Sequence, residues 1–156
     1  MMSVDRQNRV LVVDDDADVR NLLVTMFRQR ALAVDVAADG QQALDLLRDR
    51  QYAVVILDIL MPVLNGFGVL EKLSGDSRGV SASSPVVLVL TGADRNTIDG
   101  LDGRGVHGIV RKPFDPEELT SLVVACAEIK GRGPLEAMAM AMIAGGPILA
   151  WLSGKI

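Results

Sequence analysis

The stretch VVILDILMPVLNG, residues 54–66, decides the fold of this chain. Its first four residues are aliphatic, as in a strand buried on both faces of a parallel sheet, and the run ends on Asp58. Pro62 then prevents an immediate helix, and Asn65 with Gly66 is typical of a turn. Ligands of open α/β sheets bind beyond the carboxyl ends of the strands, so Asp58 lies where chemistry is expected. A helix-capping or turn role for this residue is the alternative.

Four other aliphatic runs resemble this strand and alternate with helical patterns. Apolar residues three and four positions apart in those patterns indicate one core-facing stripe per helix. Five strands alternating with five helices predict a doubly wound, three-layer α/β fold with a parallel sheet. The predicted strands cover residues 10–13, 31–37, 52–57, 86–90 and 106–111. The first predicted helix follows Asp16, with the stripe Val19, Leu22, Leu23, Met26 and Phe27, and the second covers residues 41–50. The third contains Phe67, Leu70 and Leu73, the fourth is a short element around Ile98 and Leu101, and the fifth begins at Pro116 with Asp115 as its N-cap.

Length and composition indicate one ordinary globular domain. The chain has 156 residues, of which 49% are hydrophobic and 23% charged, and this excludes a disordered protein. A net charge of −4 without a basic cluster argues against a nucleic-acid partner. The single cysteine, Cys126, fits a core residue in a reducing compartment, and no secretion signal precedes it, so we expect a cytoplasmic protein. We expect an N-terminal tail (1–8), one domain (9–130) and an apolar extension (131–156).

Polar residues follow four of the five predicted strands. Asp14 and Asp15 follow the first, Asp58 the third, Thr91 ends the fourth and Lys112 follows the fifth. The carboxyl ends of parallel strands meet at one edge of the sheet, so these five groups are expected to converge. Three neighbouring carboxylates repel one another unless a cation lies among them. All-oxygen ligation of this kind is typical of Mg²⁺.

This arrangement suits phosphoryl transfer. With a metal ion and the Lys112 ammonium beside it, the Asp58 carboxylate is placed to attack phosphorus, while Thr91 hydrogen-bonds the phosphoryl group. Each residue also has an ordinary explanation: a cap or loop aspartate, a strand-end hydroxyl, a solvated surface lysine. Matching residue types at four separate strand ends favour the functional interpretation. The lone His107 is expected at the surface or a strand edge rather than as a metal ligand.

The chain resembles the receiver domains of two-component response regulators. Four motifs match in order and approximate spacing: VLVVDDD at 10–16, ILDILMPVLNG at 56–66, VLVLTGA at 87–93 and KPF at 112–114. The resemblance covers residues from about 8 to 130. It implies a flavodoxin-like (βα)5 fold with strand order 2-1-3-4-5. It also implies that Asp58 accepts a phosphoryl group from a phosphohistidine of a histidine kinase or phosphotransfer protein.

The resemblance assigns further roles at this edge of the sheet. It implies that Asp15 and Asp58 bind Mg²⁺ directly, that the Leu60 carbonyl completes the protein ligands and that Asp14 acts through water. Contacts to the phosphoryl oxygens are implied for Thr91 and Lys112, and a cis peptide bond for Lys112–Pro113.

Two features depart from the family's usual pattern. Ile109 occupies the position, three residues before the lysine, where the family often has an aromatic switch residue. Leu60 lies two residues past Asp58 and Ala93 two past Thr91, and neither side chain can position an attacking water. We therefore predict a long-lived phosphoryl group. Ile109 leaves open whether a conventional switch operates, and activation can still proceed through Thr91, which would draw the following loop toward the phosphoryl group.

The extension is apolar but interrupted. Gly145-Gly146-Pro147 divides residues 137–152 into pieces shorter than the roughly 20 residues of a membrane-spanning helix, which disfavours an anchor. We expect helical segments at 135–143 and 148–152 that pack on the domain, help form a homodimer or bind a partner. The chain is then a stand-alone receiver that signals by contact with a downstream protein.

Two other functions compete with this one. A haloacid dehalogenase-like hydrolase also uses Mg²⁺ and an aspartate nucleophile, but it needs a second aspartate where Leu60 stands. An unphosphorylated receiver-fold scaffold is the third interpretation. The signalling protein would not turn over a diffusible substrate; it would promote transfer to its own Asp58 and slow hydrolysis of the product.

Overall fold

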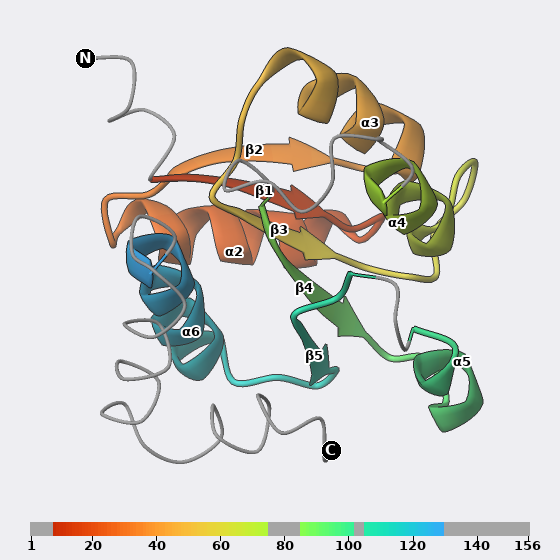
Figure 1. Cartoon of the computed structure of the whole chain (residues 1–156). Coiled ribbons are helices and arrows are strands. Elements are labelled where there is room, and N and C mark those ends of the chain that lie inside the picture. Colours follow the sequence, from red (N-terminus) through yellow and green to blue (C-terminus); the bar gives the residue numbers. More distant parts are fainter. Residues whose placement is uncertain (1–7, 75–84, 102–104, 130–156) are drawn as a thin grey trace.

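A computed structural model describes residues 8–74, 85–101 and 105–129 of the chain (Figure 1). The N-terminal tail up to residue 7, the segment 75–84 and the predicted extension with its two helical segments lie outside the described residues. The elements are β1 (Arg9–Val13), α2 (Ala17–Arg28), β2 (Ala33–Ala37), α3 (Gly40–Asp49), β3 (Val54–Leu57), α4 (Gly66–Ser74), β4 (Val86–Thr91), α5 (Arg95–Asp99), β5 (Gly108–Arg111) and α6 (Pro116–Ile129).

The five strands form one parallel sheet in the order β2-β1-β3-β4-β5, which confirms the predicted fold and strand order. The centre of the sheet is buried on both faces: all four residues of β3 are inaccessible to solvent. This is why its sequence is a continuous aliphatic run instead of an alternating one.

Successive strand residues point to opposite faces and supply two separate cores. On one face, Val12, Ile56 and Leu88 pack with residues of α2 and α6. On the other face, residues such as Leu57 and Val89 pack with α3, α4 and Leu101, which follows α5. The helices therefore cover both faces of the sheet, as Figure 1 shows. None of the helices within the described ranges has the length and apolarity needed to cross a bilayer.

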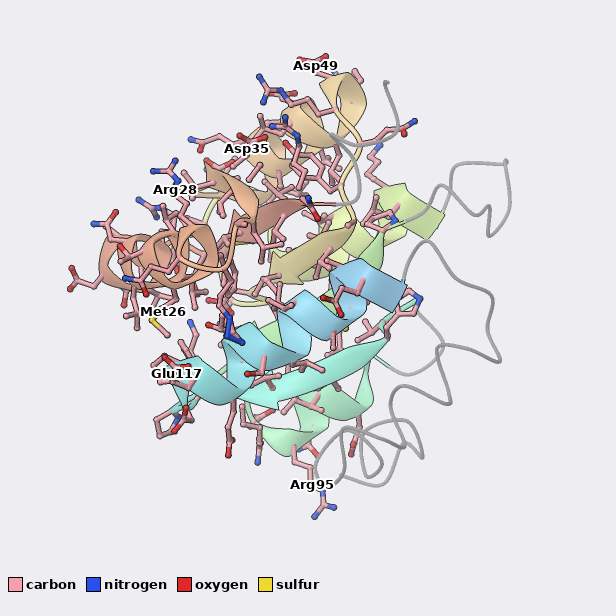
Figure 2. All side chains as sticks on the ribbon, turned by 90° about the vertical axis from the view of Figure 1, so that its left-hand side faces the viewer. Met26, Arg28, Asp35, Asp49, Arg95 and Glu117 are labelled. Carbon is pink, nitrogen blue, oxygen red and sulfur yellow. The ribbon has the colours of Figure 1, made fainter. Side chains whose placement is uncertain are left out.

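The helix caps follow the sequence closely. Asp16 accepts hydrogen bonds from the first backbone N–H groups of α2, and the Asp115 carboxylate does the same at the start of α6. Cys126 is buried in the core, where burial raises the pKa of its thiol to about 12. Charged side chains such as Arg28 and Asp49 project outward from the ribbon in Figure 2.

The predicted stripe of α2 is wrong at one residue. Leu23 and Phe27 are fully buried, but Leu22 is 42% exposed. The reason is that α6 packs against α2 beside the sheet and turns the buried arc toward Val24, which lies on the opposite side of Leu23 from Leu22.

Three strands, β2, β3 and β5, begin later than predicted, and β4 ends one residue later. β2 begins at Ala33, because Ala31 adopts a left-handed conformation (φ 61°) at the turn that ends α2. β3 begins at Val54, β5 begins at Gly108, and β4 continues through Thr91. The predicted fourth helix is, as expected, a short one of five residues.

Candidate phosphoryl-transfer site

The register of β1 against β3 places two carboxylates at the same edge of the sheet. Val13 pairs with Leu57, and the ladder continues one step further, since the Asp58 N–H donates to the Val13 carbonyl at 2.9 Å. The residue after β1 is Asp14 and the residue after β3 is Asp58, so the register places these two aspartates side by side. Their side chains are buried, with 2% and 5% of each residue exposed.

Asp15 completes a group of three carboxylates. One oxygen from each of Asp14, Asp15 and Asp58 lies within 4.8 Å of the other two, and Asp15 is exposed to solvent. An oxygen-only donor set with two buried anions and one exposed side fits a hard divalent cation such as Mg²⁺, which retains several waters. The site predicted from the strand ends is thus assembled from the predicted acidic residues.

Lys112, the residue after β5, contacts two of these three carboxylates. Its Nζ lies 2.7 Å from Asp14 Oδ2 and 3.3 Å from Asp58 Oδ2. Burial acts to lower the pKa of Lys112, but the hydrogen bond and charge of Asp14, together with the charge of Asp58, raise it overall. The ammonium group therefore stays protonated at neutral pH and links the two buried carboxylates.

Burial also sets the protonation of Asp58. Desolvation raises the pKa of its carboxyl, the charge of Lys112 opposes this, and the charge of Asp14 adds to it, so the pKa lies above its ordinary value. The Leu60 N–H donates to Asp58 Oδ1 at 3.2 Å and stabilises the ionised form. A cation bound beside this buried carboxylate would stabilise its ionised form further.

Thr91 lies at the end of the neighbouring strand, fully buried. Its Oγ1 accepts a hydrogen bond from the Ala93 N–H at 3.1 Å, and its carbonyl accepts one from the Lys112 N–H at 3.0 Å. The hydroxyl is thus engaged with its own loop in this structure, one strand away from the carboxylates. The oxygen accepts in this bond, so the bond does not use the hydroxyl proton.

The residues that depart from the family's pattern also have clear positions. The Leu60 side chain is 58% exposed, whereas Ala93 is buried. Ile109 is half-buried on β5 and packs with the core on the α3 and α4 side. The Lys112–Pro113 peptide bond is cis, as the resemblance implies. His107 immediately precedes β5, and its Nδ1 accepts from the Val87 N–H, so it is a strand-edge residue as expected.

Sequence reasoning missed three residues around the site. An Arg20 guanidinium nitrogen donates to the Asp14 carbonyl at 2.7 Å, and one from Arg111 donates to the Ala93 carbonyl at 3.3 Å. The Gly40 N–H donates to a carbonyl of the loop that follows Asp58. Of these three residues, only Arg20 could have been predicted from the sequence, because it lies one helical turn after Asp16, the N-cap of α2, and therefore close to the end of β1.

Comparison with known proteins agrees with this geometry. The family model for the response regulator receiver domain matches residues 10–124. The chain belongs to this family. It is therefore a receiver domain of the kind used in two-component signal transduction.

Two curated relatives and two solved structures illustrate the similarity. The DNA-binding response regulator MtrA of Mycobacterium tuberculosis is 35% identical over 138 residues, 86% of this chain and 57% of MtrA. The probable transcriptional regulator ycf27 of Guillardia theta is 35% identical over 125 residues, 80% of this chain and 47% of the relative. The Francisella response regulator 1452 receiver domain has a TM-score of 0.67 at 30% identity, with 78% of this chain and 97% of that chain covered. Chemotaxis response regulator CheY4 of Vibrio cholerae has a TM-score of 0.67 at 28% identity, with coverage of 76% and 97%.

The receiver domain spans about half the length of the curated relatives it matches. Some of those relatives are named as DNA-binding regulators, so they give no support to the expectation that nucleic acid is not a partner. A stand-alone role and the part played by residues 131–156 stay predictions.

Proposed function

We propose that this receiver domain is a phosphorylation-dependent switch in which Asp58 accepts a phosphoryl group. The observation that carries the proposal is the buried Asp58 at the end of β3, 3.3 Å from the Lys112 ammonium and grouped with Asp14 and Asp15. Membership of the response regulator family supports a phosphohistidine of a histidine kinase or phosphotransfer protein as the donor. The single cysteine fits action in the cytoplasm.

The reaction follows from the charges at the site. An Asp58 oxygen attacks phosphorus, the new O–P bond forms as the P–N bond to the imidazole breaks, and the leaving nitrogen takes a proton. Lys112 lies where it neutralises charge on the transferred group. When bound by Asp15, Asp58 and the Leu60 carbonyl, with Asp14 acting through water, Mg²⁺ supplies further charge neutralisation at the phosphoryl oxygens.

Transfer would then be read out through the loop after β4. The Thr91 oxygen at present accepts from the Ala93 N–H, and a phosphoryl oxygen on Asp58 would offer the hydroxyl proton a charged acceptor. Turning toward it releases Ala93 and shifts the loop, so the face around α5 changes shape for a downstream protein. This route needs no aromatic residue at Ile109.

Leu60 is expected to prolong the signal. Its exposed side chain is apolar, and Ala93 is buried and small, so neither orients a water for attack on the aspartyl phosphate. The same lack of a second acidic group argues against a haloacid dehalogenase-like hydrolase, which needs a general acid or base two residues past the nucleophile.

Intact mass spectrometry tests the proposal. The protein is incubated with Mg²⁺ and acetyl phosphate, and wild type is compared with Asp58→Ala and with Asp45→Ala, an exposed aspartate of α3, as a matched control. We expect wild type and the control to gain one stable phosphoryl group and Asp58→Ala to gain none. Rapid release of free phosphate without accumulation would instead support the hydrolase, and no gain in any protein would support the scaffold.

A further inference from the structure

The start of α3 is fastened to the phosphoacceptor loop, residues 59–65, which joins Asp58 to α4. The Gly40 N–H donates to the Leu64 carbonyl at 2.9 Å. A second backbone bond closes the loop on itself, since the Gly66 N–H donates to the Ile59 carbonyl at 3.0 Å. The loop that carries the Leu60 carbonyl is therefore fixed at its far end by a helix that takes no part in the chemistry.

The contact leaves no space for a side chain at residue 40. A Cβ atom placed on Gly40 would overlap the Leu64 carbonyl oxygen and lie 2.9 Å from the Leu64 Cβ. On the other side of the loop, a Cβ on Gly68 of α4 would lie 2.9 Å from Leu64 Cγ. Leu64 therefore lies against glycines of two helices, and a side chain at either glycine would displace it.

Gly40 is present for space and not for its backbone conformation. It shows no positive φ, unlike Gly105 at φ 77°. Asp39 is the N-cap of α3, and its Oδ1 accepts from the Gln42 N–H at 2.9 Å, which fixes where the helix begins. Because the start of the helix is fixed, the Gly40 N–H points at the Leu64 carbonyl.

We infer that Gly40 is a positioning residue for the metal and phosphoryl site, acting through Leu64 on the Leu60 carbonyl and the Asp58 backbone. The inference rests on the function proposed above. A methyl group at residue 40 must push the Leu64 carbonyl away, and the closed loop transmits that shift toward Leu60 because its other end is held by Ile59 and Gly66.

Mg²⁺ binding measured by isothermal titration calorimetry tests the inference. Wild type is compared with Gly40→Ala and with Gln41→Gly, which weakens the exposed neighbouring position of α3 without entering the Leu64 contact. We expect roughly tenfold weaker Mg²⁺ binding for Gly40→Ala, the size of effect seen when supporting residues around a metal are changed. The control should stay within about twofold of wild type. Equal affinity of folded Gly40→Ala and wild type would overturn the inference.

A second measurement uses the wild-type protein alone and is independent of whether the variant folds. Amide hydrogen exchange is followed at Gly40 with and without Mg²⁺, with Gly100, whose N–H bonds within its own helix region to Asn96, as the reference. Slower exchange at Gly40 only is expected. Unchanged exchange at Gly40 in protein that binds Mg²⁺ overturns the positioning role and leaves the proposed function standing. Wild type that neither binds Mg²⁺ nor gains a phosphoryl group overturns both.

Discussion

The loops that follow β3 and β4 flank the same site but are held by different kinds of contact. In the phosphoacceptor loop the Leu60 N–H donates to Asp58 Oδ1, as the Ala93 N–H does to Thr91 in the other loop, but backbone hydrogen bonds and glycines pressed against Leu64 and Asp58 also hold it. The loop after β4 is held by side chains: Thr91 Oγ1 accepts from Ala93, and Arg111 donates to the Ala93 carbonyl. Steric contact resists displacement, whereas losing a side-chain hydrogen bond costs about 1 kcal/mol and exchanging it for another costs less.

The backbone of the phosphoacceptor loop supports this contrast. Val63 has a φ of 68° and a side chain that is 84% exposed. A β-branched residue in this conformation costs on the order of 1–3 kcal/mol and persists only where surrounding structure imposes it. The comparison therefore teaches a division of labour, in which steric contacts fix the loop beside the carboxylate, whereas the loop after β4 is held by side-chain hydrogen bonds, as the proposed switching requires.

The largest difference should come from adding a methyl group at Gly66, the first residue of α4 after the phosphoacceptor loop, or at Gly92 in the loop after β4. A Cβ on Gly66 would lie 2.5 Å from the Asp58 carbonyl oxygen, whereas the nearest atom to one on Gly92 is Lys112 Cβ at 3.9 Å. We expect Gly66→Ala to lower the free energy of unfolding by about 3 kcal/mol, the upper end of the cost of overpacking, and Gly92→Ala to change it by less than about 0.5 kcal/mol. Urea denaturation measures both. Equal losses would show that the loops do not differ in this way.

The lifetime of the phosphoryl group tests the role of the Leu60 side chain, which the phosphoacceptor loop carries next to Asp58. Replacing Leu60 by asparagine, Leu60→Asn, introduces an amide that can orient water, and we expect loss of phosphate to become roughly tenfold faster, or about 1.4 kcal/mol in the barrier. Decay of the phosphorylated mass after removal of the donor measures it. Val63→Asn, in the same loop and also exposed, is the matched control and should leave the decay unchanged. No acceleration in Leu60→Asn would count against a role for Leu60 in signal lifetime.

The buried charge of Asp58, just before the phosphoacceptor loop, has a cost in folding stability that can be measured. Burial raises the pKa of Asp58 above the 3.8 of an exposed aspartate, so the folded protein prefers the protonated form. The Asp58 carboxyl therefore lowers folding stability progressively as the pH rises from 3.8 through its raised pKa, and it has no such effect at lower pH. Without divalent ions at pH 7, we expect Asp58→Asn to be more stable than wild type by roughly 1 kcal/mol.

That difference should disappear at pH 3.5, where wild-type Asp58 is protonated, and should shrink when Mg²⁺ saturates the wild-type site. Urea denaturation with a chelator, repeated with Mg²⁺, follows both effects. Asp45→Asn changes an exposed carboxylate of the same type and should show neither. A variant that is less stable than wild type at pH 7 would mean that Lys112 outweighs burial at Asp58.

The contrast also explains which parts of the molecule could be predicted from the sequence. Buried parallel strands are continuous aliphatic runs, and the residue after each run marks the strand end, so Asp58 and its neighbours were found from consecutive letters. Their convergence followed from the rule that parallel strands end at one edge. The contacts that distinguish the two loops join residues far apart in the chain, Gly40 to Leu64 and Arg111 to Ala93, and no local pattern encodes them. The exposure of Leu22 had the same origin, because it depends on where α6 packs.

The smallest expected effect comes from the side-chain contact of the β4 loop. Arg111→Ala removes the hydrogen bond to the Ala93 carbonyl and, because the guanidinium is exposed, should cost no more than about 0.5 kcal/mol of stability. It should nevertheless speed amide hydrogen exchange at Ala93 and Asp94 several-fold while leaving Leu60 unchanged, since only one of the two loops is released. Arg95→Ala is the control, as that side chain points away from the domain in Figure 2. Faster exchange at Leu60 as well would mean that the loops move together and that the division of labour is wrong.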